Sequence, residues 1–224
     1  MTREKLAERK LPDYTKGEEI MNMVTHIVGG CAGIVSLVLG IVIAVGHKSG
    51  YALAGAIVYG IAMILLYTFS SVYHGLRPHL PAKKVMQVMD HCSIFMLIAG
   101  TYTPIVLCTI REFDPTLAWV LFAIVWTAAI VGVVLNSIDI KRYKKFSAAC
   151  YLMMGWCIVF AYRAFGFLVT RGGTGLLIAG GLCYTVGAGF YYFFKKTRYM
   201  HSVFHLFVLA GSITHMLYIL LHIL

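Results

Sequence analysis

Seven long apolar stretches constrain the fold of this 224-residue chain more than any other feature of its sequence. They cover, approximately, residues 22–45, 51–75, 85–109, 116–137, 146–169, 174–194 and 200–223. A helix needs about 20 apolar residues to cross the hydrocarbon core of a bilayer, and these stretches are too long and too continuous for barrel strands. The sequence therefore predicts an all-α integral membrane protein, with seven transmembrane helices in one domain, residues 22–224, behind a polar N-terminal segment, residues 1–21.

The composition agrees with a membrane protein and excludes most soluble classes. Hydrophobic residues make up 60% of the chain and charged residues 12%, whereas soluble domains carry roughly a quarter charged residues. The net charge is +10, but the basic residues lie in short runs between the apolar stretches, which suits membrane orientation and not nucleic-acid binding. The six cysteines are scattered without a C-x-x-C pair, which favours packing over disulfides or metal binding. The charged first 20 residues lack the apolar region of a signal peptide.

Lysine and arginine are distributed unequally between the two sides of the predicted bundle. One side receives fifteen of them: Arg3, Lys5, Arg9, Lys10, Lys16, Arg77, Lys83, Lys84, Lys141, Arg142, Lys144, Lys145, Lys195, Lys196 and Arg198. The other side receives Lys48, Arg111 and Arg171, while Arg163 lies within the fifth stretch, close enough to its outer end to reach the interface. Because basic loops stay in the cytoplasm, the N-terminus is predicted to be cytoplasmic and the C-terminus outside.

Two short motifs indicate how the helices begin and pack. Thr15 and Glu18 form a T-x-x-E capping box, which predicts a short helix that starts there and leads into the first span; the alternative is a disordered polar tail. Gly29 and Gly33 form a G-x-x-x-G step, which favours close packing between helices, as do the glycines of 180–189.

Polar residues recur near the cytoplasmic ends of the predicted spans. At 1.5 Å per residue, His201 and His205 lie about 5 and about 10 Å into the last span from its basic flank. His74 lies one turn from the end of the second span, with Ser70 on the same helix face, and Asp90 opens the third span at a similar depth. Ionisable residues are costly in a membrane and face the bundle interior or a wet cavity, so these residues are predicted to meet.

The chemistry that this set suggests is a zinc site. His201 and His205, four residues apart on one helix, can present two imidazoles to one ion, and His74 supplies a third. Three histidines with an open fourth position are typical of catalytic zinc, which lowers the pKa of a bound water and polarises a carbonyl. Asp90 can then take the proton of the water as a general base, and Ser70 can hydrogen-bond the water or a developing oxyanion.

Each of these residues also has a structural interpretation. The three histidines can act as hydrogen-bond donors between helices. Asp90 can pair with His91 or Lys84 at the interface, and Ser70 can bond the backbone of its own helix. Structural hydrogen bonding is the expectation for His26 and His91, and helix packing or a cavity lining for His215.

Four motifs in order along the chain resemble one bacterial family. They are "YTKGEEIMNMVTHIVGG", "SSVYHGLRP", "MDHCSIFMLIAGTYTPI" and "HSVFHLFVLAGSITHMLYI". Together they resemble the bacterial hemolysin III family, which shares a superfamily with the progestin and adiponectin receptors and, more distantly, with the alkaline ceramidases. The resemblance implies a seven-helix protein of the bacterial plasma membrane with a cytoplasmic N-terminus.

The resemblance also implies roles for individual residues. The S-x-x-x-H motif of the relatives corresponds to Ser70 and His74, their aspartate to Asp90, and their H-x-x-x-H motif to His201 and His205. In those relatives the three histidines bind zinc and the aspartate contacts the zinc-bound water. The chain lacks the long soluble N-terminal region of the receptors and has short outer loops, so no extracellular protein ligand is expected.

Three functions of different class follow as hypotheses. The first is a zinc-dependent intramembrane hydrolase that acts on a lipid amide or ester and affects membrane lipid homeostasis. The second is a non-enzymatic sensor or regulator of membrane fluidity with structural zinc, and the third is a cytolytic pore-forming protein, as the family name suggests. Membrane lipids are the expected partners in the first two, and the sequence does not define an oligomeric state.

Overall fold

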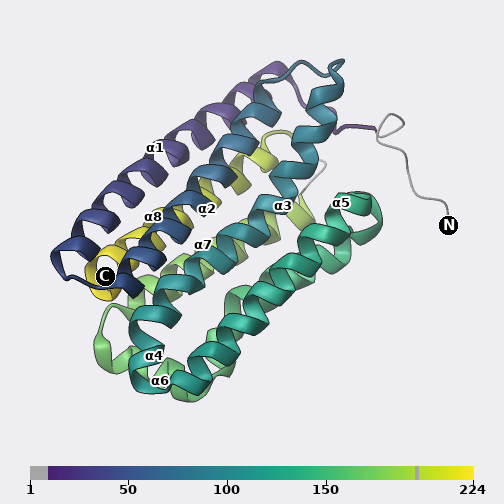
Figure 1. Ribbon diagram of the computed structural model, residues 1–224. Coiled ribbons are helices and arrows are strands. Elements are labelled where there is room, and N and C mark those ends of the chain that lie inside the picture. Colours follow the sequence, from purple (N-terminus) through teal and green to yellow (C-terminus); the bar gives the residue numbers. More distant parts are fainter. Residues whose placement is uncertain (1–9, 195–196) are drawn as a thin grey trace.

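The computed structural model describes residues 10–194 and 197–224, and over these residues every secondary-structure element is a helix (Figure 1). The elements are α1 (Lys16–Gly46), α2 (Gly50–Gly75), α3 (Pro81–Pro104), the π-helix η2 (Ile105–Ile110), α4 (Arg111–Phe113), α5 (Pro115–Phe160), α6 (Tyr162–Arg171), α7 (Thr174–Phe193), α8 (Met200–Tyr218) and the π-helix η3 (Ile219–Ile223). Among the basic residues counted above, Arg3, Lys5, Arg9, Lys195 and Lys196 lie outside the described residues.

Six helical segments of the described chain are long and apolar enough to cross a membrane. They are Lys16–Gly46, Gly50–Gly75, Pro81–Phe113, Pro115–Phe160, Thr174–Phe193 and Met200–Ile223. The fourth of them, α5, contains both the predicted fourth stretch and most of the predicted fifth. Its 46 residues would extend about 69 Å as a straight helix, far more than a bilayer core of about 30 Å.

Helix α5 folds back on itself at Asp139, where the backbone leaves the helical region (φ −162°, ψ 98°). Its two arms then run side by side in opposite directions (Figure 1). Buried Asn136 in the first arm joins the second arm, because it accepts a hydrogen bond from Ser147 (2.7 Å) and donates one to the Tyr151 hydroxyl (3.2 Å). The predicted fourth and fifth stretches are therefore two arms of one helical hairpin.

The predicted fifth stretch, residues 146–169, is wrong as a single helix. The α5 helix ends at Phe160, Ala161 departs from helical geometry (φ −80°, ψ 64°), and a separate α6 follows. Beyond this break Arg163 is exposed, and its guanidinium lies 3.7 Å from Asp114, whose side chain caps the start of α5. The chain thus places an ion pair at the end of the bundle opposite the turn at Asp139.

The first helix shows how the bundle meets a membrane. Its buried face consists of small and polar residues: Glu18, Asn22, His26, Gly29, Gly33, Ser36, Gly40 and Ala44. Its outward face carries large apolar residues, among them Val24, Ile27, Val35 and Leu39, with about half of each side chain exposed. A helix in water would turn these faces the other way, whereas lipid requires an apolar outer surface.

Glycines allow α1 and α2 to pack closely, as the G-x-x-x-G step predicted. A Cβ atom on Gly29 would lie 2.3 Å from the Tyr67 ring, and one on Gly33 would lie 3.1 Å from the backbone nitrogen of Ile64. Small residues let helix backbones approach in a membrane, where lipid offers no hydrophobic drive for association. This contact sets α1 against the helix that carries His74.

Alternating helix directions bring four helix ends together. The start of α1, the end of α2, the start of α3 and the start of α8 lie at the same end of the bundle, and the C-terminus lies at the opposite end (Figure 1). At that opposite end the ring nitrogen Nδ1 of His47 contacts the Leu224 carbonyl oxygen at 2.6 Å. The polar residues singled out from the sequence therefore converge at one end.

The capping box predicted from the sequence is formed at the same end of the bundle, because the Thr15 side chain accepts from Glu18 N–H and the Glu18 side chain accepts from Thr15 N–H. The α1 helix then runs on without a break past residue 22.

Candidate metal centre

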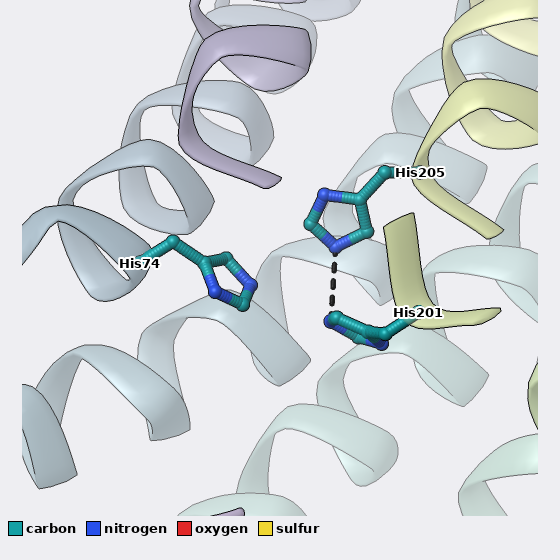
Figure 2. Close-up of side chains that lie close together, drawn as sticks. All are labelled: His74, His201 and His205. Atoms are coloured by element: carbon teal, nitrogen blue, oxygen red, sulfur yellow. Dashed lines mark hydrogen bonds between the residues drawn. The ribbon is translucent and has the colours of Figure 1, made fainter. Parts of the chain in front are cut away.

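Three histidines from two helices form a compact group at this end of the bundle. His74 comes from the last turn of α2, and His201 and His205 come from the first turns of α8. One ring nitrogen from each lies within 4.8 Å of the corresponding atoms of the other two, so the group can hold a metal ion. Figure 2 shows the His74 ring pointing toward the pair on α8, whose Nε2 atoms lie 3.0 Å apart.

The α1 helix holds the start of α8 in position. Glu18 Oε1 accepts a hydrogen bond of 2.7 Å from the Tyr199 backbone N–H, two residues before His201. Ser202 Oγ donates a hydrogen bond of 2.6 Å to Asn22 Oδ1, and both of these residues are fully buried. Because a helix places residues four apart on one face, fixing Ser202 also fixes the direction of His201 and His205.

Unpartnered ring nitrogens indicate that this group suits a ligand. His74 Nε2 and His201 Nδ1 are buried and have no hydrogen-bond partner in the described chain. His205 can donate from Nδ1 to the Asn22 carbonyl oxygen at 3.4 Å, which leaves its Nε2 directed at the group. Buried polar atoms are nearly always paired, so the orphaned His74 Nε2 indicates a place for a ligand, and three imidazoles are a donor set that zinc accepts. The residues present therefore fit a metal ion.

Asp90 and Ser70 lie near the histidines, but neither belongs to the three-residue group. The Asp90 carboxylate interacts electrostatically with His74, His201 and His205. Its Oδ2 also lies 3.4 Å from His91 Nδ1, which is one of the structural pairings expected from the sequence. The Ser70 hydroxyl is completely buried beside the Asp90 carboxylate, with which it interacts. It bonds no backbone carbonyl oxygen in the described chain, so it is not a backbone-bonded serine. Their catalytic roles stay predictions.

The remaining histidines divide into bonded and unbonded cases. His91 Nδ1 contacts the Gln87 carbonyl oxygen at 2.9 Å, and His215 Nε2 contacts the Leu177 carbonyl oxygen on α7 at 3.0 Å. The expectation of structural hydrogen bonding is wrong for His26, because neither of its buried ring nitrogens has a partner in the described chain. Its ring instead stacks on the His205 ring, with centroids 3.7 Å apart.

Glu19 and Lys83 were not singled out from the sequence, yet both lie against the site. Glu19 Oε2 lies 2.6 Å from His74 Nδ1, and Glu19 Oε1 accepts a hydrogen bond of 2.8 Å from Lys83. The count of basic residues treats Lys83 as a loop charge, but Pro81 starts α3 and Lys83 lies in its first turn, only 1% exposed. The spacing of Glu19, Asn22 and His26 on one face of α1 is the sequence signal that identifies this surface.

Tyr14 covers the group from the segment before α1. Its ring stacks on His201 with centroids 5.0 Å apart and lies 5.7 Å from the His74 ring. Burial raises the pKa of Tyr14 far above its ordinary value, with smaller contributions from Tyr73 and Tyr191, so the phenol stays neutral. A hollow of about 290 Å³ adjoins this ring, lined by Leu11, Pro12, Asp13, Tyr14, Glu19, Pro78 and Lys84.

Fold and site together define a class: a multi-pass helical membrane protein with a buried group of three histidines at one end of its bundle. The family model described as haemolysin-III related matches residues 14–216, and the chain belongs to that family. Hemolysin-3 of Bacillus cereus is 41% identical over 195 residues, which are 87% of this chain and 87% of that protein. A hemolysin-3 homolog of Bacillus subtilis (strain 168) is 36% identical over 199 residues, 89% of this chain and 91% of that protein. The human monocyte to macrophage differentiation factor is 26% identical over 162 residues, 70% of this chain and 66% of that protein.

These findings confirm the family that the four motifs resemble. They also support the expected location, because bacterial relatives of this kind with several apolar helices lie in the plasma membrane.

Proposed function

We propose that this protein is a zinc-dependent intramembrane hydrolase that acts on an amide or ester of a membrane lipid. The observation that carries the proposal is the buried group of His74, His201 and His205, with ring nitrogens within 4.8 Å of one another and no partner at His74 Nε2. A three-histidine donor set leaves one position of a tetrahedral zinc ion open, which is typical of catalytic sites.

The same proposal assigns the chain seven membrane crossings, with the N-terminus in the cytoplasm. The turn of α5 at Asp139 supports it, since the two arms count as separate crossings. Lys144, just after that turn, donates to the hydroxyl of Tyr191, whose ring lies 5.6 Å from His201, so the basic residues of 141–145 share the end that holds the histidines. Basic residues favour the cytoplasmic side, which places the site near that face.

The residues of the chain have distinct tasks in this proposal. Bound zinc supplies Lewis-acid activation of water and polarises a carbonyl oxygen. The Asp90 carboxylate accepts the proton that the attacking water loses, and later delivers it to the leaving amine or alkoxide. The Ser70 hydroxyl, which is fully buried beside Asp90, donates to the oxygen on which negative charge develops. The lipid reaches the site from the side, because the outward faces of the helices are apolar.

Lipid analysis of cells tests the proposal. In a strain lacking the protein, the wild-type chain should restore a specific lipid product, and Asp90→Asn should fail to restore it although it folds. General acid–base catalysis contributes roughly 10²–10⁴-fold in rate, so loss of the carboxylate should leave little product. Asp114→Asn is the matched control, because Asp114 caps α5 at the other end of the bundle and should behave like wild type.

A second candidate is a non-enzymatic regulator of membrane fluidity in which zinc clamps the helices. The observation that favours it is the enclosure of the group: His74 and His205 are 2% exposed, and Tyr14 stacks on His201. A clamp needs the histidines and not Asp90. Full restoration of the lipid composition by Asp90→Asn, together with its loss in His205→Ala, would favour the regulator over the hydrolase.

A further inference from the structure

His74 differs from the other two histidines in the partner of its second ring nitrogen. Its Nδ1 lies 2.6 Å from a carboxylate oxygen of Glu19. Asn22 Nδ2 is also near, at 3.4 Å from His74 Nδ1. The side-chain oxygen Oδ1 of Asn22 accepts a hydrogen bond from Ser202, so Nδ2 is the amide nitrogen. An amide nitrogen donates hydrogen bonds and cannot accept one from the imidazole. The proton on Nδ1 therefore points to Glu19, and the lone pair on Nε2 points into the group.

The second nitrogens of His205 and His201 have weaker partners or none. His205 Nδ1 lies 3.4 Å from a backbone carbonyl oxygen, and His201 Nδ1 has no hydrogen-bond partner in the described chain. Among these three residues, His74 has the shortest contact and the one made to a carboxylate. It is also the one that joins the α2 helix to a pair carried by α8. The orientation of the His74 ring therefore sets the distance between its Nε2 and the ring nitrogens of His201 and His205, because α8 alone positions those two residues.

Glu19 is itself held by a buried cation. The Lys83 ammonium donates to Glu19 Oε1 at 2.8 Å and to the carbonyl oxygens of Tyr73 and Leu76 at 2.9 Å each. Those carbonyls belong to Tyr73 in the last turn of α2 and to Leu76 directly after it, on either side of His74 in the chain. Burying an ammonium costs several kcal/mol unless every proton finds an acceptor, and all three protons do so here. One lysine thus ties α3 to the carboxylate of α1 and to the end of α2.

We propose that Glu19 is the positioning residue of the metal centre, because it holds His74 in the tautomer and orientation that direct Nε2 at the ion, while Lys83 holds the Glu19 carboxylate in place. The inference rests on the metal centre of the proposed function and not on hydrolysis. Metal-binding histidines commonly donate their second N–H to a carboxylate, and loss of that partner weakens metal binding about 10–100-fold.

A purely structural alternative uses the same contacts. Glu19 can act only as the counter-charge of Lys83, in which case its removal destabilises the fold and affects the metal through that damage alone. The two roles differ in a variant that removes both charges. Replacing a buried ion pair by uncharged residues of similar size is often tolerated, whereas removing one partner is not.

Zinc affinity of the purified full-length protein in detergent distinguishes these roles. Each protein is stripped with a chelator and titrated with zinc against a chromophoric competitor, and thermal unfolding is recorded without metal. We expect about 10-fold weaker binding for Glu19→Gln, whose amide oxygen can still accept, and about 100-fold weaker binding for Glu19→Leu. The absorption spectrum of the cobalt-substituted protein should change in both variants, because the imidazole of His74 loses its fixed orientation.

The control is Glu112→Gln, the same change of residue type at the opposite end of the bundle (Figure 1). Glu112 lies in α4, where its Oε2 is 3.6 Å from the Arg171 guanidinium, away from the metal-binding histidines. It should keep the zinc affinity of the wild type. If Glu19→Leu does not fold, Glu19→Gln carries the test.

Two results would overturn the inference. One is equal zinc affinity for Glu19→Gln and wild type. The other is recovery of wild-type affinity in the double variant Glu19→Gln, Lys83→Met, which should remain weak if Glu19 positions His74. A wild-type protein that binds no zinc is a different outcome, because it removes the metal centre of the proposed function together with this refinement.

Discussion

At the scale of single residues, burial without a partner identifies the site better than residue type does. The chain has nine histidines, and three of them have ordinary explanations: His91 and His215 bond to backbone carbonyls, and His47 contacts the Leu224 carbonyl oxygen. His74 is distinguished by an occupied Nδ1 and an orphaned, buried Nε2. A lone pair kept away from water and left unpaired costs free energy, which a bound metal ion would recover.

Metal content tests the assignment residue by residue. Wild-type protein should purify with about one zinc per chain, because one three-histidine site is available. His205→Ala should lose most of it, since two remaining ligands rarely hold zinc tightly. Asp90→Asn should keep it, because Asp90 lies outside the group of three. Elemental analysis of gel-filtered samples measures this, with His215→Ala as the control from the same helix. An Asp90→Asn protein as zinc-poor as His205→Ala would make Asp90 a direct ligand.

At the scale of elements, the hairpin of α5 depends on polar contacts between its arms. Asn136 is 1% exposed and bonds both Ser147 and Tyr151 across the turn at Asp139. The buried Ser147 hydroxyl, 4% exposed, donates a hydrogen bond to Asn136 Oδ1. Interhelical hydrogen bonds of this kind join arms that lipid alone would not press together. The residues that hold the turn thus also keep the second arm against the middle of α3, where Tyr151 donates to the His91 carbonyl oxygen at 2.8 Å.

Substitution of Asn136 measures this contribution. Asn136→Leu, of similar volume, should destabilise the protein by about 1–2 kcal/mol, because it leaves the Ser147 hydroxyl buried and unpaired. Thermal unfolding in detergent, followed by circular dichroism, reports the change. Ser137→Ala is the matched control, since the neighbouring Ser137 is exposed and bonds the Val133 carbonyl oxygen of its own arm. Equal destabilisation by both variants would show that the contact between the arms contributes nothing specific.

At the scale of the whole molecule, the seven crossings that we propose would place the two ends of the described chain on opposite sides of the membrane. The described chain begins at the end that holds the histidines and finishes at the opposite end (Figure 1). Basic residues gather at the first of these ends, as shown by Lys144 near Tyr191 and by Arg77 after α2. At the other end Arg163 and Arg171 face the carboxylates of Asp114 and Glu112 at 3.7 and 3.6 Å, which offsets their positive charge. The asymmetry predicts which end stays in the cytoplasm.

Reporter fusions test this orientation. Alkaline phosphatase fused after Leu224 should be active, because that end is predicted to lie outside, and the same reporter fused after Lys145 should be inactive. A fluorescent reporter that matures only in the cytoplasm should give the opposite pattern and serves as the control. The reverse pattern in both series would place the histidine group at the outer face and would contradict the proposed orientation.

The sequence alone predicts most of the helices and the group of three histidines, because both depend on local pattern. Long apolar runs predict the spans, and the shared depth of His74, His201 and His205 predicts a group that the structure brings together. Only the tertiary structure shows which residues surround that group. They are Glu19 beside His74, buried Lys83, which donates to Glu19, and His26, whose ring stacks on His205. Spacing along a helix indicates which residues share a face of that helix. The rotation and depth of each helix relative to its neighbours determine which faces of two helices are in contact. Those two quantities follow from packing over the whole bundle, such as the approach of α1 to α2 at Gly29 and Gly33, and not from any single segment.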